Sequence, residues 1–116
     1  MRTPKPENKV FFVRFHKDLQ EMIEEYAQEH DIKKATLTSR ILEEYVASPF
    51  PLSPLACCCF IKRGRGYEKT IGKGMNVTMK KISINEIRIR AESEKMKECD
   101  FRTAIIFSYL ENAKGR

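Results

Sequence analysis

The chain has 116 residues, of which 41% are hydrophobic and 33% are charged. That length suits one domain or two very small ones, and it leaves a core smaller than most enzymes assemble around a pocket. The apolar fraction is high enough for folding, which argues against wholesale disorder and predicts a compact soluble protein. A multi-step catalytic protein is therefore not expected.

The positive charge of the chain is concentrated in one stretch. The formal net charge is +6, from 22 Lys and Arg against 16 Asp and Glu. Residues 60–81 carry seven basic side chains and one acidic one, whereas the segments before and after them are close to neutral. A localised positive field favours a polyanionic partner, either nucleic acid or an anionic membrane surface.

Neither a signal segment nor a metal site is expected. Residues 1–8 are polar and contain two prolines, and the longest apolar run, Leu55–Ile61, is seven residues long against the roughly 20 that span a bilayer. These features predict an intracellular protein. The four cysteines, Cys57–Cys59 and Cys99, form no CxxC pair, so we expect no structural zinc and no cofactor.

The first structured part of the chain reads as a strand followed by two helices. Val10–Arg14 is β-branched and aromatic, which predicts a short strand, and His16–His30 has apolar residues at helical spacing. After a short break, Thr36 is the expected N-cap of a second helix, which ends before Pro49.

The same pattern recurs 64 positions later without a gap, and the apolar positions of the two copies coincide. We therefore interpret the chain as a duplication. The identical pairs are Lys9/Lys73, Val13/Val77, Lys17/Lys81, Ile23/Ile87, Ala27/Ala91, Lys33/Lys97, Ile41/Ile105 and Tyr45/Tyr109.

Residues 48–72 separate the copies. This segment begins with three prolines, as linkers do, continues through Cys57–Cys59 and ends in the basic stretch. The three cysteines are best explained by packing, because a free cysteine behaves as a small hydrophobe, and lipidation and redox chemistry are the alternatives. The basic residues are either a DNA-contacting arm or a solvated loop.

A single strand leaves its backbone groups unpaired, so each copy needs a partner strand. The other copy is the obvious partner, either within one chain or swapped between two. We therefore predict a mostly α fold with a two-stranded antiparallel β-ribbon, in which two tandem units form a pseudo-dimer. The expected parts are a flexible arm over residues 1–8, a unit over 9–47, the linker over 48–72 and a second unit over 73–116.

Four features of the first copy occur together in a known family: the strand Phe11–Phe15, the helical apolar series that includes Leu19 and Ile23, the turn before Thr36, and the apolar series that begins at Leu37. In these features the chain resembles the ribbon-helix-helix family, the superfamily of the Arc and MetJ repressors. The match recurs in the second copy, and two copies in one chain are similar to the tandem ribbon-helix-helix regulators of archaeal viruses. The resemblance implies a sequence-specific, double-stranded-DNA-binding transcription regulator in the cytoplasm of a prokaryotic host.

Family members insert the ribbon into the DNA major groove and read base edges with alternate side chains. Strand alternation with Val13 and Val77 in the core puts Phe12 and Arg14 outward on one strand and Asn76, Thr78 and Lys80 outward on the other. The resemblance makes these five the expected base-reading residues. Phe12 has no hydrogen bond to offer, so it contacts a thymine methyl, folds inward or meets another protein, and the polar residues of the second strand are alternatively only solvated.

The family's second contact is a phosphate held by backbone amides at the start of the second helix, where the helix dipole favours an anion. In the second copy Asp100 is the expected N-cap, and its charge opposes a phosphate. The first copy thus has the stronger phosphate anchor and the second copy has the stronger reading strand. This difference predicts a non-palindromic half-site for each chain. The expected phosphate contacts are Lys33, Lys34, Thr36, Lys62, Arg63, Arg65, Lys73 and Lys97.

No pattern in the sequence indicates catalysis. His16 and His30 have no sequence-near nucleophile, and no phosphate-binding loop of the Walker type occurs. Two other functions stay open. One is a protein-interaction module or antitoxin-like DNA-binding partner that uses Val10 and Phe12, and the other is a peripheral membrane protein anchored by acylated Cys57–Cys59. The exposed apolar residues also favour a homo-oligomer, either a dimer or a larger array growing along DNA.

Overall fold

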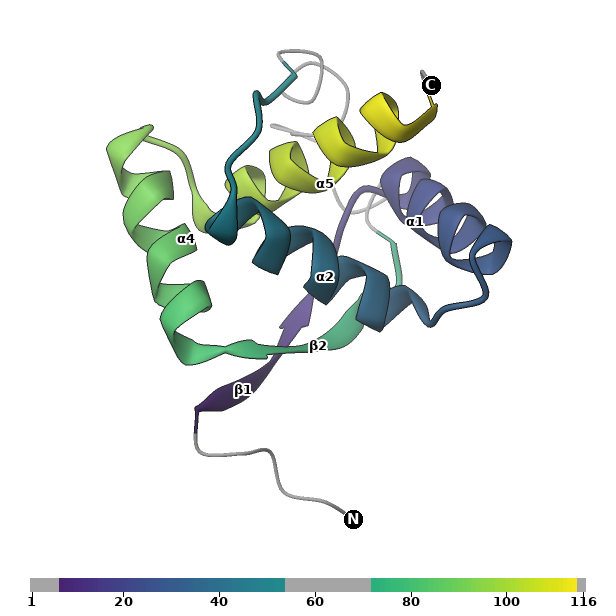
Figure 1. Cartoon of the computed structure of the whole chain (residues 1–116), viewed down its shortest axis with the longest axis horizontal. Coiled ribbons are helices and arrows are strands. Elements are labelled where there is room, and N and C mark those ends of the chain that lie inside the picture. The colour runs from purple at the N-terminus through teal and green to yellow at the C-terminus, as the bar shows by residue number, and fades with distance from the viewer. Residues whose placement is uncertain (1–6, 54–71, 115–116) are drawn as a thin grey trace.

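The computed structural model describes residues 7–53 and 72–114 of the chain and contains two β-α-α units packed together (Figure 1). The predicted class, mostly helical with a two-stranded antiparallel sheet, is confirmed. The elements are β1 (Asn8–Val13), α1 (Lys17–Glu29), α2 (Lys34–Ala47), β2 (Met75–Lys80), α4 (Lys81–Ser93) and α5 (Glu98–Lys114).

The two strands pair antiparallel within the chain, in a register that reflects the duplication. Phe12 lies opposite Asn76, the residue at the equivalent position of the second repeat, 64 residues later, and Val10 lies opposite Thr78. A pseudo-twofold axis therefore passes through the Phe12–Asn76 pair. The predicted strand Val10–Arg14 is wrong at both ends, because the ladder begins at Asn8 and stops at Val13.

The repeat extends to the backbone of the turn between the two helices of each unit. Asp31, after α1, has a φ of 54°, and Lys95, after α4, has a φ of 58°. In both turns the next N–H reaches back to the helix: Ile32 donates to the Ala27 carbonyl and Met96 to the Ala91 carbonyl, each at 2.9 Å. This is the Schellman arrangement that ends many helices, here without the usual glycine.

The expected N-cap residues are wrong in both units. The Lys33 carbonyl accepts the Leu37 N–H at 2.9 Å, so α2 already runs from Lys34 and Thr36 lies inside its first turn. α5 likewise begins at Glu98, which places Asp100 in the first turn, where a carboxylate stabilises the positive end of the helix dipole.

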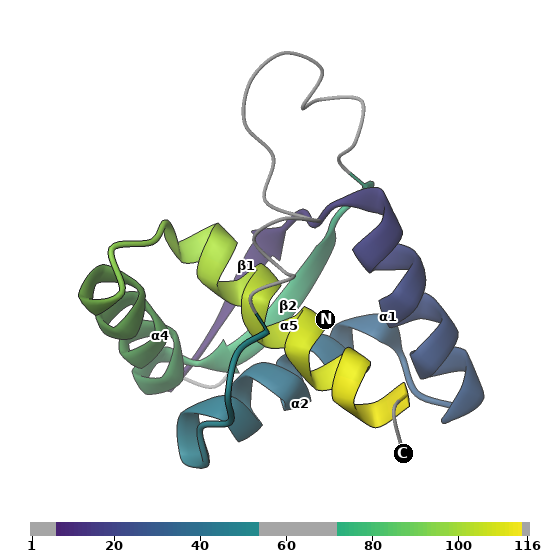
Figure 2. The ribbon, with the colours of Figure 1, turned by 90° about the horizontal axis from the view of Figure 1, so that it is seen from above.

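The core lies between the inner face of the ribbon and the helices. Figure 2 shows α5 crossing over the ribbon, with α1 and α4 on opposite sides. Repeat-related positions are buried alike: Ile23 and Ile87, and also Ile41 and Ile105, are at most 2% exposed. The buried ribbon residues are Val13, Met75, Val77 and Met79. None of the described helices is long and apolar enough to cross a membrane.

Candidate nucleic-acid interface

The outer face of the ribbon carries the side chains that alternation puts there. On β2, Asn76, Thr78 and Lys80 are exposed while their neighbours are buried. On β1, Phe12 is 57% exposed and Val10 is 45% exposed. The predicted orientation of these residues is confirmed, and the interpretation in which Phe12 folds inward is wrong.

Phe12 and Arg14 are held in place by a sharp turn of the opposite strand. Gly74 has a φ of +87°, and a Cβ built on it would lie 2.4 Å from Cζ of Phe12 and 2.8 Å from Cγ of Arg14. Arg14 Nε also donates to the Gly72 carbonyl at 3.2 Å. A guanidinium has five N–H donors and this contact uses one, so a fixed Arg14 still has donors for a ligand.

A crevice of about 220 Å³ joins the ribbon to the first turns of α2. It is lined by Ala35, Thr36, Ser39, Arg40, Asn76 and Thr78. Ser39 Oγ donates to the Thr78 carbonyl at 2.8 Å, which fixes the helix against the strand. The structure thus brings two expected base-reading residues next to Thr36, an expected phosphate contact.

Arg40 is the residue of this crevice that the sequence prediction missed. It is exposed and follows Thr36 by four residues, so both lie on one helix face. That spacing from Thr36 was the signal that could have identified it. Arg40 adds a positive charge to the crevice that Ala35 and Thr36, from the first turn of α2, also line.

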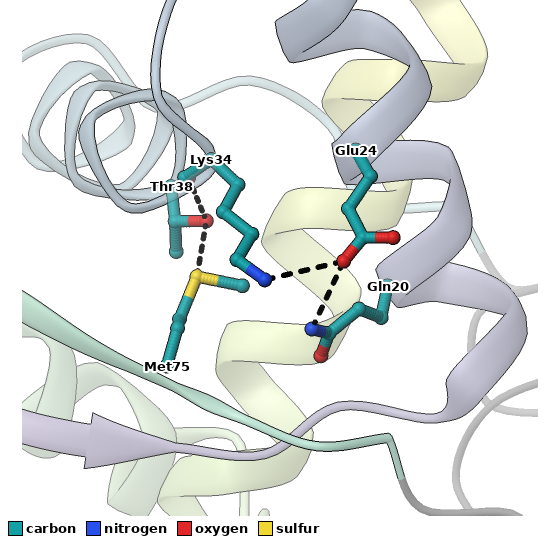
Figure 3. Close-up of polar contacts among 5 residues, drawn as sticks. All are labelled: Gln20, Glu24, Lys34, Thr38 and Met75. Atoms are coloured by element: carbon teal, nitrogen blue, oxygen red, sulfur yellow. Dashed lines mark hydrogen bonds and ion pairs between the residues drawn. The ribbon is translucent and has the colours of Figure 1, made fainter.

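The two lysines at the start of α2 lie differently. Lys33 precedes the helix and is exposed. The ammonium of Lys34 lies 3.3 Å from Oε2 of Glu24 on α1, and the same oxygen accepts from Gln20 Nε2 at 3.4 Å (Figure 3). Both charged side chains are partly exposed, and such a surface ion pair contributes only about 0–1 kcal/mol, so it would yield readily to a competing anion.

The start of α2 is also tied to the inner face of the ribbon. Thr38 Oγ1 donates to the Lys34 carbonyl at 2.9 Å and lies 3.5 Å from Sδ of Met75 (Figure 3). Thr38 and Met75 are both buried. The distance between the helix start and β2 is therefore set by packing.

The start of α5 has the opposite charge. Lys97 is exposed in front of it, but Glu98 and Asp100 lie in its first turn. Glu98 accepts from Arg88 Nε at 3.2 Å and from Arg102 Nη1 at 2.9 Å. Those two arginines compensate one carboxylate, and Asp100 still disfavours an anion at this end of the helix.

The remaining predicted contacts lie at the ends of the ribbon or outside the described residues. Lys73 and the Lys80 side chain are exposed, and the Lys80 backbone N–H donates to Oε2 of Glu43 at 3.0 Å. Ser83 Oγ donates to the other oxygen of Glu43, so this α2 carboxylate stabilises the start of α4. The residues outside the described ranges are Lys62, Arg63, Arg65 and Cys57–Cys59.

No family model, no curated protein and no solved structure matches this chain. Within residues 7–53 and 72–114, no group of three or more His, Cys, Asp or Glu side chains could hold a metal ion. The features of this chain that indicate a function are therefore its fold, the exposed ribbon face and the charges beside it.

Proposed function

We propose that this chain is a sequence-specific, double-stranded-DNA-binding transcription regulator of the ribbon-helix-helix type. The single observation that carries the proposal is the exposed ribbon face, flanked by the crevice at the start of α2. The major groove of B-DNA is about 12 Å wide and admits a two-stranded ribbon. Base reading and phosphate anchoring would then occur side by side.

The chemistry of the ribbon face fits base edges. An asparagine such as Asn76 can pair with both hydrogen-bonding atoms of adenine, Arg14 can donate to guanine, and a threonine such as Thr78 can meet a base acceptor or a methyl group. Phe12 and Val10 offer apolar contact with thymine methyls. Because the pseudo-twofold axis relates Phe12 to Asn76 and Arg14 to Thr78, the two strands present different residues to the two halves of the site. The expected half-site is therefore non-palindromic.

Phosphate anchoring is expected to be strongest at α2. Lys33 and Thr36 lie at the positive end of that helix and Arg40 lines the same crevice as Thr36, whereas the corresponding turn of α5 contains two carboxylates. Lys34 would contribute after leaving Glu24. Lys73 and Lys97, with Lys62, Arg63 and Arg65, stay predicted contacts that neutralise further phosphates.

The test begins with selection of bound sequences from a random duplex pool at fixed salt. On the selected duplex, Arg14→Ala, Asn76→Ala and Lys80→Ala are each expected to weaken binding by about 1–3 kcal/mol without changing the melting temperature. Asn112→Ala, an exposed asparagine on α5, is the matched control. Unchanged affinity in all three ribbon variants would exclude the ribbon as the reader.

The role of Phe12 has its own test. Replacing thymine by deoxyuridine in the selected duplex removes only the methyl groups. The wild-type chain should lose about 0.8 kcal/mol, or about fourfold in affinity, for each methyl that it buries, and Phe12→Asn should lose less. Equal losses for both chains would show that Phe12 does not read the methyl.

The exposed Phe12 and Val10 side chains also support a second candidate, a protein-interaction or antitoxin-like module. In that case Phe12→Ala should abolish a protein complex and leave DNA affinity unchanged. No catalytic role is proposed: Nδ1 of His16 accepts the Asp18 N–H at 3.1 Å at the start of α1, and His30 stacks on Tyr26. The membrane-anchoring alternative depends on Cys57–Cys59, outside the described residues, and stays a prediction.

A further inference from the structure

The outward face of α4, the helix that directly follows β2, carries an apolar stripe. Ile82 is 77% exposed and Ile89 is 51% exposed, and the exposed Asn85 lies between them. Positions separated by three, four and seven residues share one face of a helix, so these three side chains form a continuous strip. We call it the α4 stripe.

The fold does not require this stripe. α1 is the repeat counterpart of α4 and lies on the opposite side of the molecule (Figure 1). Its residues at the positions of Ile82 and Asn85 are Asp18 and Glu21, both exposed, and Glu25 stands where Ile89 does. The duplicated units thus keep the same buried face, and only α4 has apolar side chains on its outer face.

The charges at the two ends of the α4 stripe are complementary to each other. Lys81 is exposed at its N-terminal end and Glu92 at its C-terminal end. Neither side chain forms an ion pair within the described ranges, whereas Arg88 and Arg90 are paired with Glu98 and Glu86. If a second α4 packs antiparallel with Ile82 against Ile89, Lys81 of one copy comes beside Glu92 of the other, twice. Parallel packing would instead bring like charges together.

We propose that α4 is an interface through which two copies of this chain form a closed, antiparallel dimer. The contact is isologous, since each copy uses the same stripe. A groove of about 490 Å³ beside the stripe, lined by Lys9, Lys81, Ile84, Asn85 and Arg88, supplies further positive charge for the acidic end of the second copy's helix. The acidic outer face of α1 cannot make the same contact, so association stops at two chains and does not continue as an array.

The experiment is a measurement of mass in solution on the full chain, by light scattering or analytical ultracentrifugation, at rising concentration and low salt. The wild type should rise from 13.6 kDa to a plateau at twice that mass. Ile82→Lys and Ile89→Lys should each keep the chain monomeric over the same range. Lys17→Glu, the change at the α1 counterpart of Lys81, is the matched control and should leave the mass unchanged.

Charge exchange tests the antiparallel geometry. Lys81→Glu and Glu92→Lys should each weaken the dimer about 5- to 30-fold, because each replaces two attractions by two repulsions. An equimolar mixture of the two variants should recover the wild-type affinity, since the mixed dimer contains two opposite-charge pairs. If the dimer were parallel, each single variant would dimerise with the same affinity as the wild type, because one pair of like charges would replace another.

Several outcomes would overturn the proposal. A wild type that stays at one chain mass, a mass that keeps rising beyond two chains, or a dimer that survives Ile82→Lys would each exclude it. Loss of the dimer in Phe12→Asn but not in Ile82→Lys would place the contact on the ribbon. A lower melting temperature for Ile82→Lys at constant monomer mass would show that the stripe is covered within its own chain.

Discussion

Gly74→Ala should strongly destabilise this protein, although the residue lies at the edge of the ribbon. Gly74 has a φ of +87°, which a side chain rarely adopts. An added Cβ would lie 2.4 Å from Cζ of Phe12, 2.8 Å from Cγ of Arg14 and 2.9 Å from the Val13 carbonyl oxygen. The two side chains can move aside, but the backbone oxygen cannot move without shifting the strand.

The magnitude follows from two separable costs. A left-handed conformation costs a non-glycine residue roughly 1–2 kcal/mol, and forcing an atom into a filled space costs roughly 1–3 kcal/mol. The expected loss of unfolding free energy is therefore about 2–5 kcal/mol. At about 4 °C per kcal/mol for a chain of 116 residues, the melting temperature should fall by about 10 °C or more.

Thermal and urea denaturation followed by circular dichroism would measure this loss, and a Phe12→Ala background separates the two costs. The Phe12 ring is more than half exposed, so removing it alone should change the stability by at most about 0.5 kcal/mol. In that background Gly74→Ala should cost about 1 kcal/mol less, because the nearest contact is gone while the φ and the Val13 contact persist. A Gly74→Ala protein that melts with the wild type would refute this account of the turn.

Three further changes test other parts of the structure. Ile41→Ala and its repeat counterpart Ile105→Ala should each cost about 2–5 kcal/mol in denaturation experiments, because both side chains are at most 1% exposed, and a large difference between them would contradict equivalent packing of the two units. Lys95→Gly should raise the stability by roughly 0.5–1 kcal/mol, because glycine adopts the φ of 58° without strain, and a lower melting temperature would argue against that conformation. Glu24→Gln should strengthen DNA binding more than Glu21→Gln does at equal net charge, because only Glu24→Gln frees Lys34 from its ion pair. Equal affinities of the two variants would show that Lys34 does not contact a phosphate.

The sequence predicted the elements that buried side chains specify. Apolar residues at helical spacing and their recurrence 64 positions later were sufficient to predict both units, and the single strand in each unit required the pairing of β1 with β2. The ends of the elements could not be predicted in the same way. Thr36 has the side chain of a good N-cap, but the backbone hydrogen bond from Leu37 to Lys33 starts the helix earlier. The local preference of Thr36 for the N-cap position is thus overridden by the tertiary context.

The exposed site was predictable only as far as alternation along a strand allows. The outward position of Asn76 and Thr78 followed from the burial of Val77. Their proximity to Arg40 did not follow, because it depends on how α2 packs against β2. The Lys34–Glu24 ion pair could not be predicted from the sequence either, since it joins two helices whose relative placement is fixed by the core.

The duplication explains why the proposed reading surface is asymmetric. In a dimer of identical chains, every change on the ribbon occurs twice, so the two halves of the DNA site must carry the same contacts. Here the pseudo-twofold axis relates Phe12 to Asn76 and Thr36 to Asp100, so each half can change without its counterpart. Most of the buried positions related by the same axis are apolar in both units, because each unit needs the other to cover its strand and helices; the buried Ser83 at the position of Leu19 is an exception. Packing therefore constrains the two halves together while the exposed side chains are free to diverge, and such a surface can recognise a DNA site in one orientation only.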